Sequence, residues 1–395
     1  MSDLRYWLWL SQLRGISAGR ALELLRAFGS AKALYLAGGE ELRRAGVRSG
    51  EAEALCRKEI GPAEELEENC RSKGYRILCI RDAVYPERLR NIPDPPLVLF
   101  LRGELPPVDD RLCIGVVGTR KATDYGLSSA ERIARELAER GCCIVTGLAA
   151  GIDSAAARGA LAAHGTVIGV LGTGLDRVFP SGNEKLQEAV GRAGTLISEY
   201  TPGTGPTRYS FPQRNRIISG LCQGVVIVEA PEKSGALITA ARAQEQGRDI
   251  FVVPGMVDDP GFRGSNGLIR DGAQLVRDGD DILEEYLFRY PQAVLKPRPR
   301  VLPDSADTTK EAIDKAEGVD YSSLSEQLES LTETELKAVG QLAQGPCFGD
   351  ELIRRTGIPA SEALAALTML QLKGYVQEEN GKYRLLVQYQ GEGRG

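Results

Sequence analysis

Short apolar runs alternate with amphipathic segments through the middle of the chain, between about positions 111 and 253. The apolar runs are rich in β-branched residues and fall at 113–117, 142–146, 167–171, 195–198, 225–229 and 250–253. The amphipathic segments have helical spacing and fall at 128–140, 153–163 and 236–246. Near-continuous apolar strands joined by helices are typical of a parallel sheet covered on both faces. The pattern therefore predicts an α/β domain with a Rossmann-like, doubly wound, mostly parallel sheet over 76–288.

The first 75 residues have the apolar spacing of short helices, as in Leu22–Phe28 and Glu51–Leu55. They predict a small helical domain of the SAM or helix-hairpin-helix type over 1–75. Within it, Leu13–Leu24 resembles a helix-hairpin-helix turn, in which Gly15 permits the tight turn and the amides of the next helix can face a phosphate. A helical bundle that only packs against its neighbour explains the same spacing equally well.

Prolines and polar residues separate the remaining parts of the chain. Tyr85–Pro107 is punctuated by prolines and is expected to be an extended connecting segment. Residues 289–322 lack the apolar content to form a core, which predicts a flexible linker. Three helical segments and a hairpin with an Asn380–Gly381 turn follow, and this order predicts a winged-helix domain over 323–390.

The composition narrows the class of protein without identifying a reaction. The 395 residues are 42% hydrophobic and 26% charged, as in ordinary globular proteins, and the net charge of -5 argues against a uniformly basic nucleic-acid coat. The eight cysteines form no C-x-x-C pair and are expected to be buried reduced thiols. The first residues contain neither a signal-peptide pattern nor a membrane-spanning run, so we expect a cytoplasmic protein that does not associate with membranes.

Patterns for catalysis and metal binding are missing from the sequence. The single histidine, His164, lies at an expected helix end, where we expect a structural role. A zinc site would need clustered ligands and a hydrolytic triad would need a G-x-S-x-G turn, and the sequence contains neither. It also contains no Walker loop and no G-x-G-x-x-G motif. We therefore expect no metal, no cofactor and no catalytic residues.

Three glycine-containing turns lie at the expected carboxyl ends of the parallel strands. They are Gly118–Arg120, Thr146–Asp153 and Lys233–Thr239, the last of which opens a helix. Open α/β sheets bind ligands at this edge because helix N-termini present unpaired amides to anions. The turns therefore predict a crevice that binds an anionic ligand.

A basic and aromatic stretch lies between positions 199 and 229, where the sequence contains no acidic residue. This stretch contains Arg208, Arg214, Arg216, Tyr209 and Phe211. Guanidinium groups hold phosphates through paired donors, and an aromatic face stacks on a base at about 1–3 kcal/mol each, so the mixture suits a single strand better than a duplex. The alternative is that Phe211 belongs to the core and that the arginines pair with carboxylates elsewhere in the fold.

The run Phe211–Leu221, together with Gly118–Arg120, Thr146–Asp153 and Ser234–Ala240, closely resembles the DNA-processing protein A family, also called DprA or Smf. The resemblance spans the central domain and is weaker at both ends. It implies a non-enzymatic protein with a Rossmann-like DNA-binding core that forms a homodimer through that core. It also implies loading of the recombinase RecA onto incoming single-stranded DNA during natural transformation, in competition with single-strand-binding protein.

The resemblance also implies which residues contact DNA. By motif position these are Gly118, Thr119, Arg120, Gly147, Gly151, Arg208, Phe211, Arg214, Asn215, Arg216, Ser234 and Gly235. Arg120 is expected to contact a phosphate from the first turn. Arg208 takes the basic position three residues before the stacking aromatic Phe211, where relatives often carry lysine. The contacts of the helical and winged-helix domains are not implied, because these modules vary in the family.

Two other classes of protein fit parts of the sequence. Phosphoribohydrolases of the lysine-decarboxylase-like family use P-G-G-x-G-T-x-x-E, but here Arg242 stands where the glutamate should be, and only Glu229 or Asp153 could substitute. The winged helix also suggests a transcription regulator. Its third helical segment, 359–373, contains no arginine or asparagine to read base edges, which disfavours sequence-specific duplex binding.

Overall fold

A computed structural model of the chain describes residues 3–13, 15–290, 332–342, 347–372, 376–379 and 382–385. The chain divides into two compact units, Met1–Pro299 and Arg300–Gly395. The linker predicted for 289–322 lies, beyond residue 290, outside the described residues. No helix within the described ranges is long and apolar enough to cross a membrane.

The first unit is built on a sheet whose central strands are all parallel. These strands are β3 (Cys113–Val117), β4 (Cys143–Thr146), β5 (Thr166–Leu171), β6 (Thr195–Ser198), β7 (Gly224–Ile227), β8 (Asp249–Val252) and β9 (Gln274–Leu275). They lie in the order β6-β5-β4-β3-β7-β8-β9. The predicted Rossmann-like, mostly parallel α/β fold is therefore confirmed.

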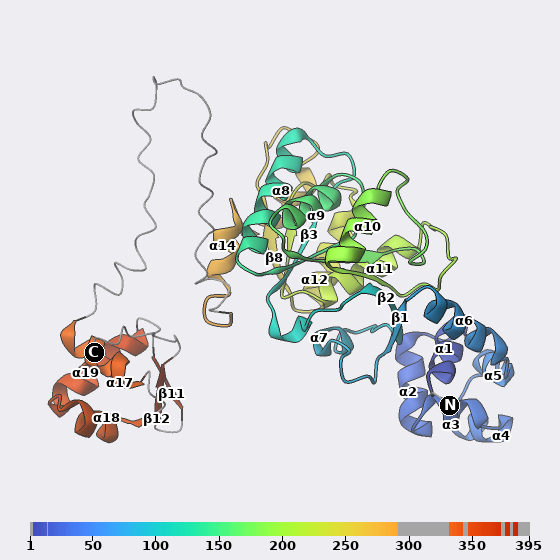
Figure 1. Cartoon of the computed structure of the whole chain (residues 1–395), viewed down its shortest axis with the longest axis horizontal. Helices are drawn as coiled ribbons and strands as arrows, with labels where there is room; N and C mark the ends of the chain where they lie inside the picture. The colour runs from blue at the N-terminus through green and yellow to red at the C-terminus, as the bar shows by residue number, and fades with distance from the viewer. Residues whose placement is uncertain are drawn as a thin grey trace. The chain divides into compact units, whose positions relative to one another are not determined.

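The strand order reverses between β3 and β7, and this reversal defines where a ligand would bind. The helices that follow the strands are α8 (Asp124–Glu139), α9 (Ile152–Ala162), α10 (Glu184–Ala193), α11 (Ser210–Gly220), α12 (Gly235–Glu245), α13 (Arg263–Arg270) and α14 (Gly279–Glu284). Figure 1 shows two groups, with α8, α9 and α10 together and α11 beside α12. Because crossovers are right-handed, the reversal places these groups on opposite faces and opens a crevice at the carboxyl ends of β3 and β7.

The segment that we expected to be a connector contributes a strand to the sheet. Strand β2 (Val98–Gly103) pairs antiparallel with β6, and β1 (Arg76–Cys79) pairs antiparallel with β2. Short helix α7 (Glu87–Arg90) precedes β2. The prediction of an extended connector over Tyr85–Pro107 was wrong, because the buried apolar run at the start of β2 lies between the prolines and completes the sheet.

The N-terminal helices share one hydrophobic core with the sheet rather than enclosing a separate one. They are α1 (Leu4–Gln12), α2 (Ala18–Phe28), α3 (Ala31–Leu36), α4 (Gly39–Arg44), α5 (Ser49–Cys56) and α6 (Gly61–Ser72). Helix α2 begins after Ser17, whose side chain accepts a hydrogen bond from the Arg20 amide and so caps the helix. Of the eight cysteines, Cys56 at the end of α5 is exposed, contrary to expectation, and the other seven are buried free thiols.

The second unit has the order of elements expected for a winged helix. Its elements are α17 (Glu333–Leu342), β10 (Cys347–Phe348), α18 (Gly349–Thr356), α19 (Ala360–Leu372), β11 (Val376–Glu379) and β12 (Lys382–Leu385). The strands form a sheet in the order β10-β12-β11, and the helices enclose a small core of their own. The predicted Asn380–Gly381 turn lies outside the described residues.

Candidate nucleic-acid interface

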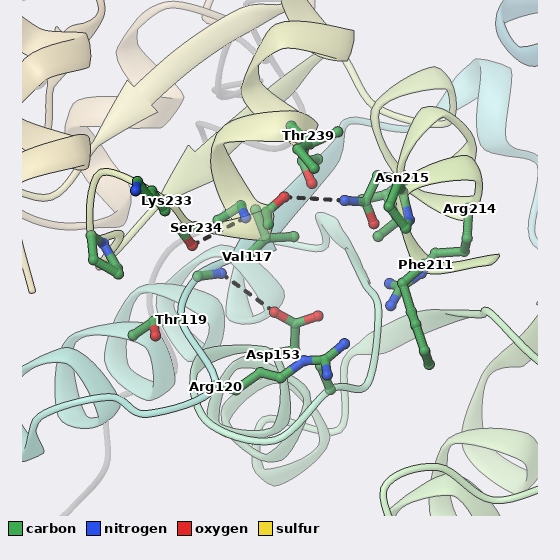
Figure 2. Close-up of a pocket in the computed structure, with 18 of the residues that line it drawn as sticks. Val117, Thr119, Arg120, Asp153, Phe211, Arg214, Asn215, Lys233, Ser234 and Thr239 are labelled. Atoms are coloured by element: carbon green, nitrogen blue, oxygen red, sulfur yellow. Dashed lines mark hydrogen bonds between the residues drawn. The ribbon is translucent and has the colours of Figure 1, made fainter. Parts of the chain in front are cut away.

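A cavity of about 490 Å³ lies at the reversal between β3 and β7, and we call it the switch-point cavity. Its lining comes from the turn after β3, the start of α9, helix α11 and the start of α12. Figure 2 shows Arg120 and Asp153 near one wall, with Arg214 and Phe211 of α11 beside them and Ser234 on another wall. The cavity therefore collects residues from four segments that are distant in sequence.

Arg214 is the most unusual side chain of this cavity. Only 4% of the residue is exposed, and its Nε atom has no hydrogen-bond partner within the described residues. The pKa of Arg214 is lowered to about 10, mainly by burial and also by the nearby Arg120 charge, while the Asp153 carboxylate opposes this shift. A buried cation with an unused donor is costly, because desolvation of the group is not repaid by a hydrogen bond. The arrangement is one that an anionic ligand would stabilise.

Asp153, at the start of α9, is the buried acid facing this arginine. Its carboxylate accepts hydrogen bonds from the Gly118 amide at 3.4 Å and the Gly147 amide at 3.0 Å. Burial raises the pKa of Asp153, whereas Arg214 and these amides lower it. Since both carboxylate oxygens are engaged by the backbone, Asp153 holds the turns after β3 and β4 together and supplies a counter-charge to Arg214.

Arg120 and Phe211 form the more open side of the cavity. The Arg120 guanidinium carbon lies 4.9 Å from the centre of the Phe211 ring and 5.8 Å from that of Phe179. The two phenylalanine rings pack together with centres 5.0 Å apart. Phe211 is thus half-buried, and Arg120 is exposed above it. The cation–π contact keeps a second guanidinium group at the cavity that contains Arg214.

The start of α12 provides a third polar wall. The Ser234 hydroxyl accepts a hydrogen bond from the Ala236 amide at 3.2 Å and caps the helix. The Asn215 side-chain amide donates to the Gly235 carbonyl at 3.2 Å, which ties α11 to α12. Lys233 precedes the cap and also lines the cavity. A helix N-terminus with an adjacent lysine attracts negative charge.

The structure brings most of the predicted DNA-contact residues into one cavity. Those that line it are Gly118, Thr119, Arg120, Arg208, Phe211, Arg214, Asn215, Ser234 and Gly235. Arg120 and Arg214 therefore face the same space, and Phe211 is not sealed in the interior. This juxtaposition is what a shared phosphate site requires.

Two predicted glycines shape the cavity from behind instead of lining it. A Cβ atom at Gly147 would lie 1.4 Å from Arg214 Nη1, so only glycine leaves room for the guanidinium. Gly151 has a φ of +78°, and a Cβ atom there would lie 2.4 Å from the Thr119 carbonyl oxygen. The amide of Gly147 already donates to Asp153, so the DNA contact predicted for this residue would have to be made without that donor.

Arg216 does not belong to the switch-point cavity, which corrects the sequence-based prediction. Its guanidinium donates to both Glu199 carboxylate oxygens at 2.7 and 2.8 Å and to Asp94 at 3.1 Å. Burial lowers the pKa of Arg216, and the two carboxylates outweigh this effect and raise it. This residue follows the alternative interpretation, in which an arginine pairs with carboxylates elsewhere in the fold.

Sequence reasoning missed three residues at or beside the cavity, and each left only a weak signal. Asp153 and Lys233 lie in the glycine-containing turns but were not assigned a contact, because their neighbours drew the assignment. Phe179 packs beneath Arg120 from the loop after β5, where no motif marks it. An acid at the start of a helix after a glycine-rich turn was the only usable indication, for Asp153.

The carboxylates that a phosphoribohydrolase would need are not available in this cavity. Glu229 accepts hydrogen bonds from the Thr123 amide at 2.9 Å and its hydroxyl at 2.8 Å, and it does not line the cavity. Arg242 is exposed on α12 and pairs with Glu245 at 2.7 Å. Asp153 remains, but backbone amides hold it. The geometry supports ligand binding better than glycosidic cleavage.

Fold and cavity together define a Rossmann-like protein with a cationic binding crevice at its switch point. Comparison with known proteins specifies the family. The family model described as DNA recombination-mediator protein A matches residues 76–287, and the DprA winged helix domain matches residues 323–382. The chain belongs to the DprA/Smf family of DNA-processing proteins.

Individual relatives support this assignment over most of the chain. Protein Smf of Synechocystis sp. is 34% identical over 96% of this chain and 98% of its own length. The DNA processing protein DprA of Bacillus subtilis is 41% identical over 54% of this chain and 72% of its own length. The X-ray structure of DprA from Streptococcus pneumoniae is 35% identical, covers 72% of this chain and 98% of that chain, and gives a TM-score of 0.63.

Proposed function

We propose that this chain binds single-stranded DNA in the switch-point cavity and acts there as a recombination mediator without cleaving any bond. The observation that carries the proposal is the buried guanidinium of Arg214, which is 4% exposed and lines the same cavity as Arg120. A phosphate placed between Arg214 and Arg120 would give both guanidinium groups a partner and relieve their mutual repulsion. Charge-assisted bonds of this kind are among the strongest available to a protein.

A single strand fits this site better than a duplex. The cation is recessed inside a cavity of about 490 Å³, whereas a duplex is stiff and presents its phosphates on a convex surface. An unpaired strand can bend so that one phosphate enters the crevice. The aromatic rings beside Arg120 then offer an edge for an exposed base.

The wider role comes from the family and not from the geometry. We propose that the chain acts as a homodimer, displaces single-strand-binding protein from incoming strands and loads RecA onto them, in the cytoplasm during natural transformation. Membership of a DNA recombination-mediator family supports this role. The cationic crevice supplies the strand-holding step that such loading needs.

A salt-titrated comparison of DNA binding tests the proposal. Fluorescence anisotropy with a labelled oligonucleotide, single-stranded or annealed to its complement, is followed across the salt range. We expect tighter binding to the single strand, and log K should fall with log salt by about 0.7 for each phosphate held. Equal affinity for both forms would contradict a single-strand site. Release of a free base from a nucleoside monophosphate would instead favour the phosphoribohydrolase alternative.

A further inference from the structure

A second cavity, which we call the seam cavity, lies where the N-terminal helices meet the sheet. Its volume is about 460 Å³, and its walls come from the end of α1, the start of α2, the segment before β2, the residues after β6 and helix α11. Glu199 and Tyr200 follow β6 directly and line it. Because β6 is parallel to β3, the seam cavity opens at the same edge of the sheet as the switch-point cavity.

Helix α11 separates the two cavities and lines both of them. Phe211, Arg214 and Ile218 face the switch-point cavity. Ser210, Gln213 and Arg216 recur at a spacing of three residues and face the seam cavity. A strand leaving the first cavity across the beginning of α11 would therefore reach the second one next.

The seam cavity has an exposed donor in Gln213, whose side-chain amide lies on the wall formed by α11. Arg216 on the same wall is 6% exposed, and its Nε and Nη2 atoms bond to carboxylates. Its Nη1 atom has no hydrogen-bond partner within the described residues but is buried out of reach of the cavity. A neutral ligand with acceptor atoms would accept a hydrogen bond from the Gln213 amide.

The charges of the seam cavity distinguish a base from a phosphate. Glu199 and Asp94 already neutralise Arg216 and leave an excess of negative charge, which disfavours a phosphate inside. The amide of Arg20 is bonded to Ser17, so the helix-hairpin-helix-like turn forms a wall in which one of the amides of the first turn of α2 is already engaged. A nucleobase is uncharged, planar and rich in acceptors, and it suits this lining.

An exposed aromatic ring lies at the entrance of the seam cavity. Tyr209 is 65% exposed and lines the seam cavity, and the Arg208 guanidinium carbon lies 4.7 Å from the centre of its ring. Arg208 itself lines the switch-point cavity. The pair therefore spans the gap between the two cavities, with a cation available to a phosphate and an exposed ring available to a base.

We propose that the seam cavity is a second nucleotide subsite, which takes a base of the same strand that occupies the switch-point cavity. The base stacks on Tyr209 with its edge toward the Gln213 amide, and its phosphate remains outside beside Arg208. This inference rests on the proposed function. It extends the DNA path by one stacked base and gives the N-terminal helices a part in binding.

Abasic scanning tests the subsite. The full chain is titrated with single-stranded oligonucleotides that each lack one base, moved stepwise along the strand, and affinity is read by fluorescence anisotropy. For Tyr209→Ala we expect about 10-fold weaker binding to the intact strand, because one stacking contact is lost. The wild-type protein should show a position at which loss of the base weakens binding, and this dependence should disappear in Tyr209→Ala.

Conservative and remote variants make the result specific. Tyr209→Phe keeps the ring and should restore most of the affinity that alanine loses. Phe288→Ala removes an equally exposed ring, 64% exposed and outside both cavities, and should bind as wild type does. If Tyr209→Ala keeps the wild-type affinity and the same abasic profile, the subsite is refuted. Arg214→Ala, measured in parallel, judges the switch-point cavity separately, so the two proposals can fail independently.

Discussion

The two faces of helix α11 contain arginines only two residues apart, and they are held in opposite ways. Arg216 is bonded to Glu199 and Asp94, and those carboxylates raise its pKa. Arg214 is equally buried, but its main attraction is the longer-range one of Asp153, and its pKa is lowered. The first arrangement balances the charge within the fold, whereas the second leaves a charge to be balanced from outside.

This difference shows that burial of an arginine does not by itself indicate its role. Direct contact with carboxylates of the fold separates a structural arginine from a ligand-binding one. Arg216 has such contacts and is mainly structural, although its side of α11 lines the seam cavity. The following changes test the comparison, beginning with the largest expected effect.

Replacing Arg214 by alanine should strongly weaken DNA binding at the face of α11 that lines the switch-point cavity. We expect the affinity for single-stranded DNA to fall at least about 30-fold, because truncating one partner of a buried charge pair costs about 2–5 kcal/mol. The free energy of unfolding should change less than the binding free energy, because relief of the costly buried cation opposes the lost packing, and the Asp153 carboxylate keeps its two backbone amides. Anisotropy and urea unfolding of the same preparation measure the two effects.

Arg214→Lys is the matched control, because it keeps the charge and loses the paired donors. It should recover only part of the affinity. In a reaction containing strands coated with single-strand-binding protein, Arg214→Ala should also fail to promote RecA filaments. Full affinity in Arg214→Ala at low and moderate salt would remove the switch-point cavity as the binding site.

Replacing Arg216 by methionine should act mainly on the fold. Methionine keeps much of the side-chain volume but leaves Glu199 without its cation, and Glu199 is only a quarter exposed. We expect a loss of about 2–3 kcal/mol in the free energy of unfolding, less than for a fully buried pair because water can reach both carboxylates. Urea unfolding measures this loss. The comparison is reversed if this variant unfolds like wild type but loses as much DNA affinity as Arg214→Ala.

The lowered pKa of Arg214 predicts a dependence on pH with a defined sign. In the unbound protein Arg214 loses its proton as the pH rises through about 10, and a bound phosphate would retain the proton to higher pH. Affinity should therefore fall about 10-fold for each pH unit above about 10. Titration with oligo(dA), with circular dichroism to verify the fold, measures the effect. A constant affinity between pH 9 and 11 would show that Arg214 does not hold the phosphate.

The same shift affects stability in the opposite direction. The pKa of Arg214 is lower in the folded chain than the usual value of an arginine, so the unfolded chain binds more protons as the pH rises above about 10. The contribution of Arg214 to the free energy of unfolding therefore becomes more favourable as pH rises through that window. The difference in the free energy of unfolding between wild type and Arg214→Ala should therefore change with pH in that window.

Much of the architecture was predictable because local patterns specify it. The parallel strands from β3 to β8 can be recognised in the sequence as β-branched runs, and glycines mark turns at carboxyl ends of the sheet. Strand β2 was missed because flanking prolines are a stronger local signal than its short apolar run. Its partner β6 lies far along the chain, and no local pattern encodes such a pairing.

The sequence predicts the chemistry of the candidate site, but not which of its arginine side chains line the cavity. A stretch without acids correctly indicated cationic side chains, yet Arg214 and Arg216 look alike in sequence. Their assignment depends on Glu199 and Asp94, which come from the end of β6 and the segment before β2. Helical periodicity places the two arginines on different faces of α11, but only the packed fold shows what each face meets.

The close approach of Gly147 to Arg214 has a consequence for the affinity with which a phosphate is bound. Backbone atoms occupy the space on one side of the guanidinium, so its side-chain torsions are restricted before any ligand arrives. A free arginine side chain carries about 2 kcal/mol of rotamer entropy. Here much of that ordering has taken place during folding, so an incoming phosphate meets a rigid receptor and loses less binding free energy to immobilisation.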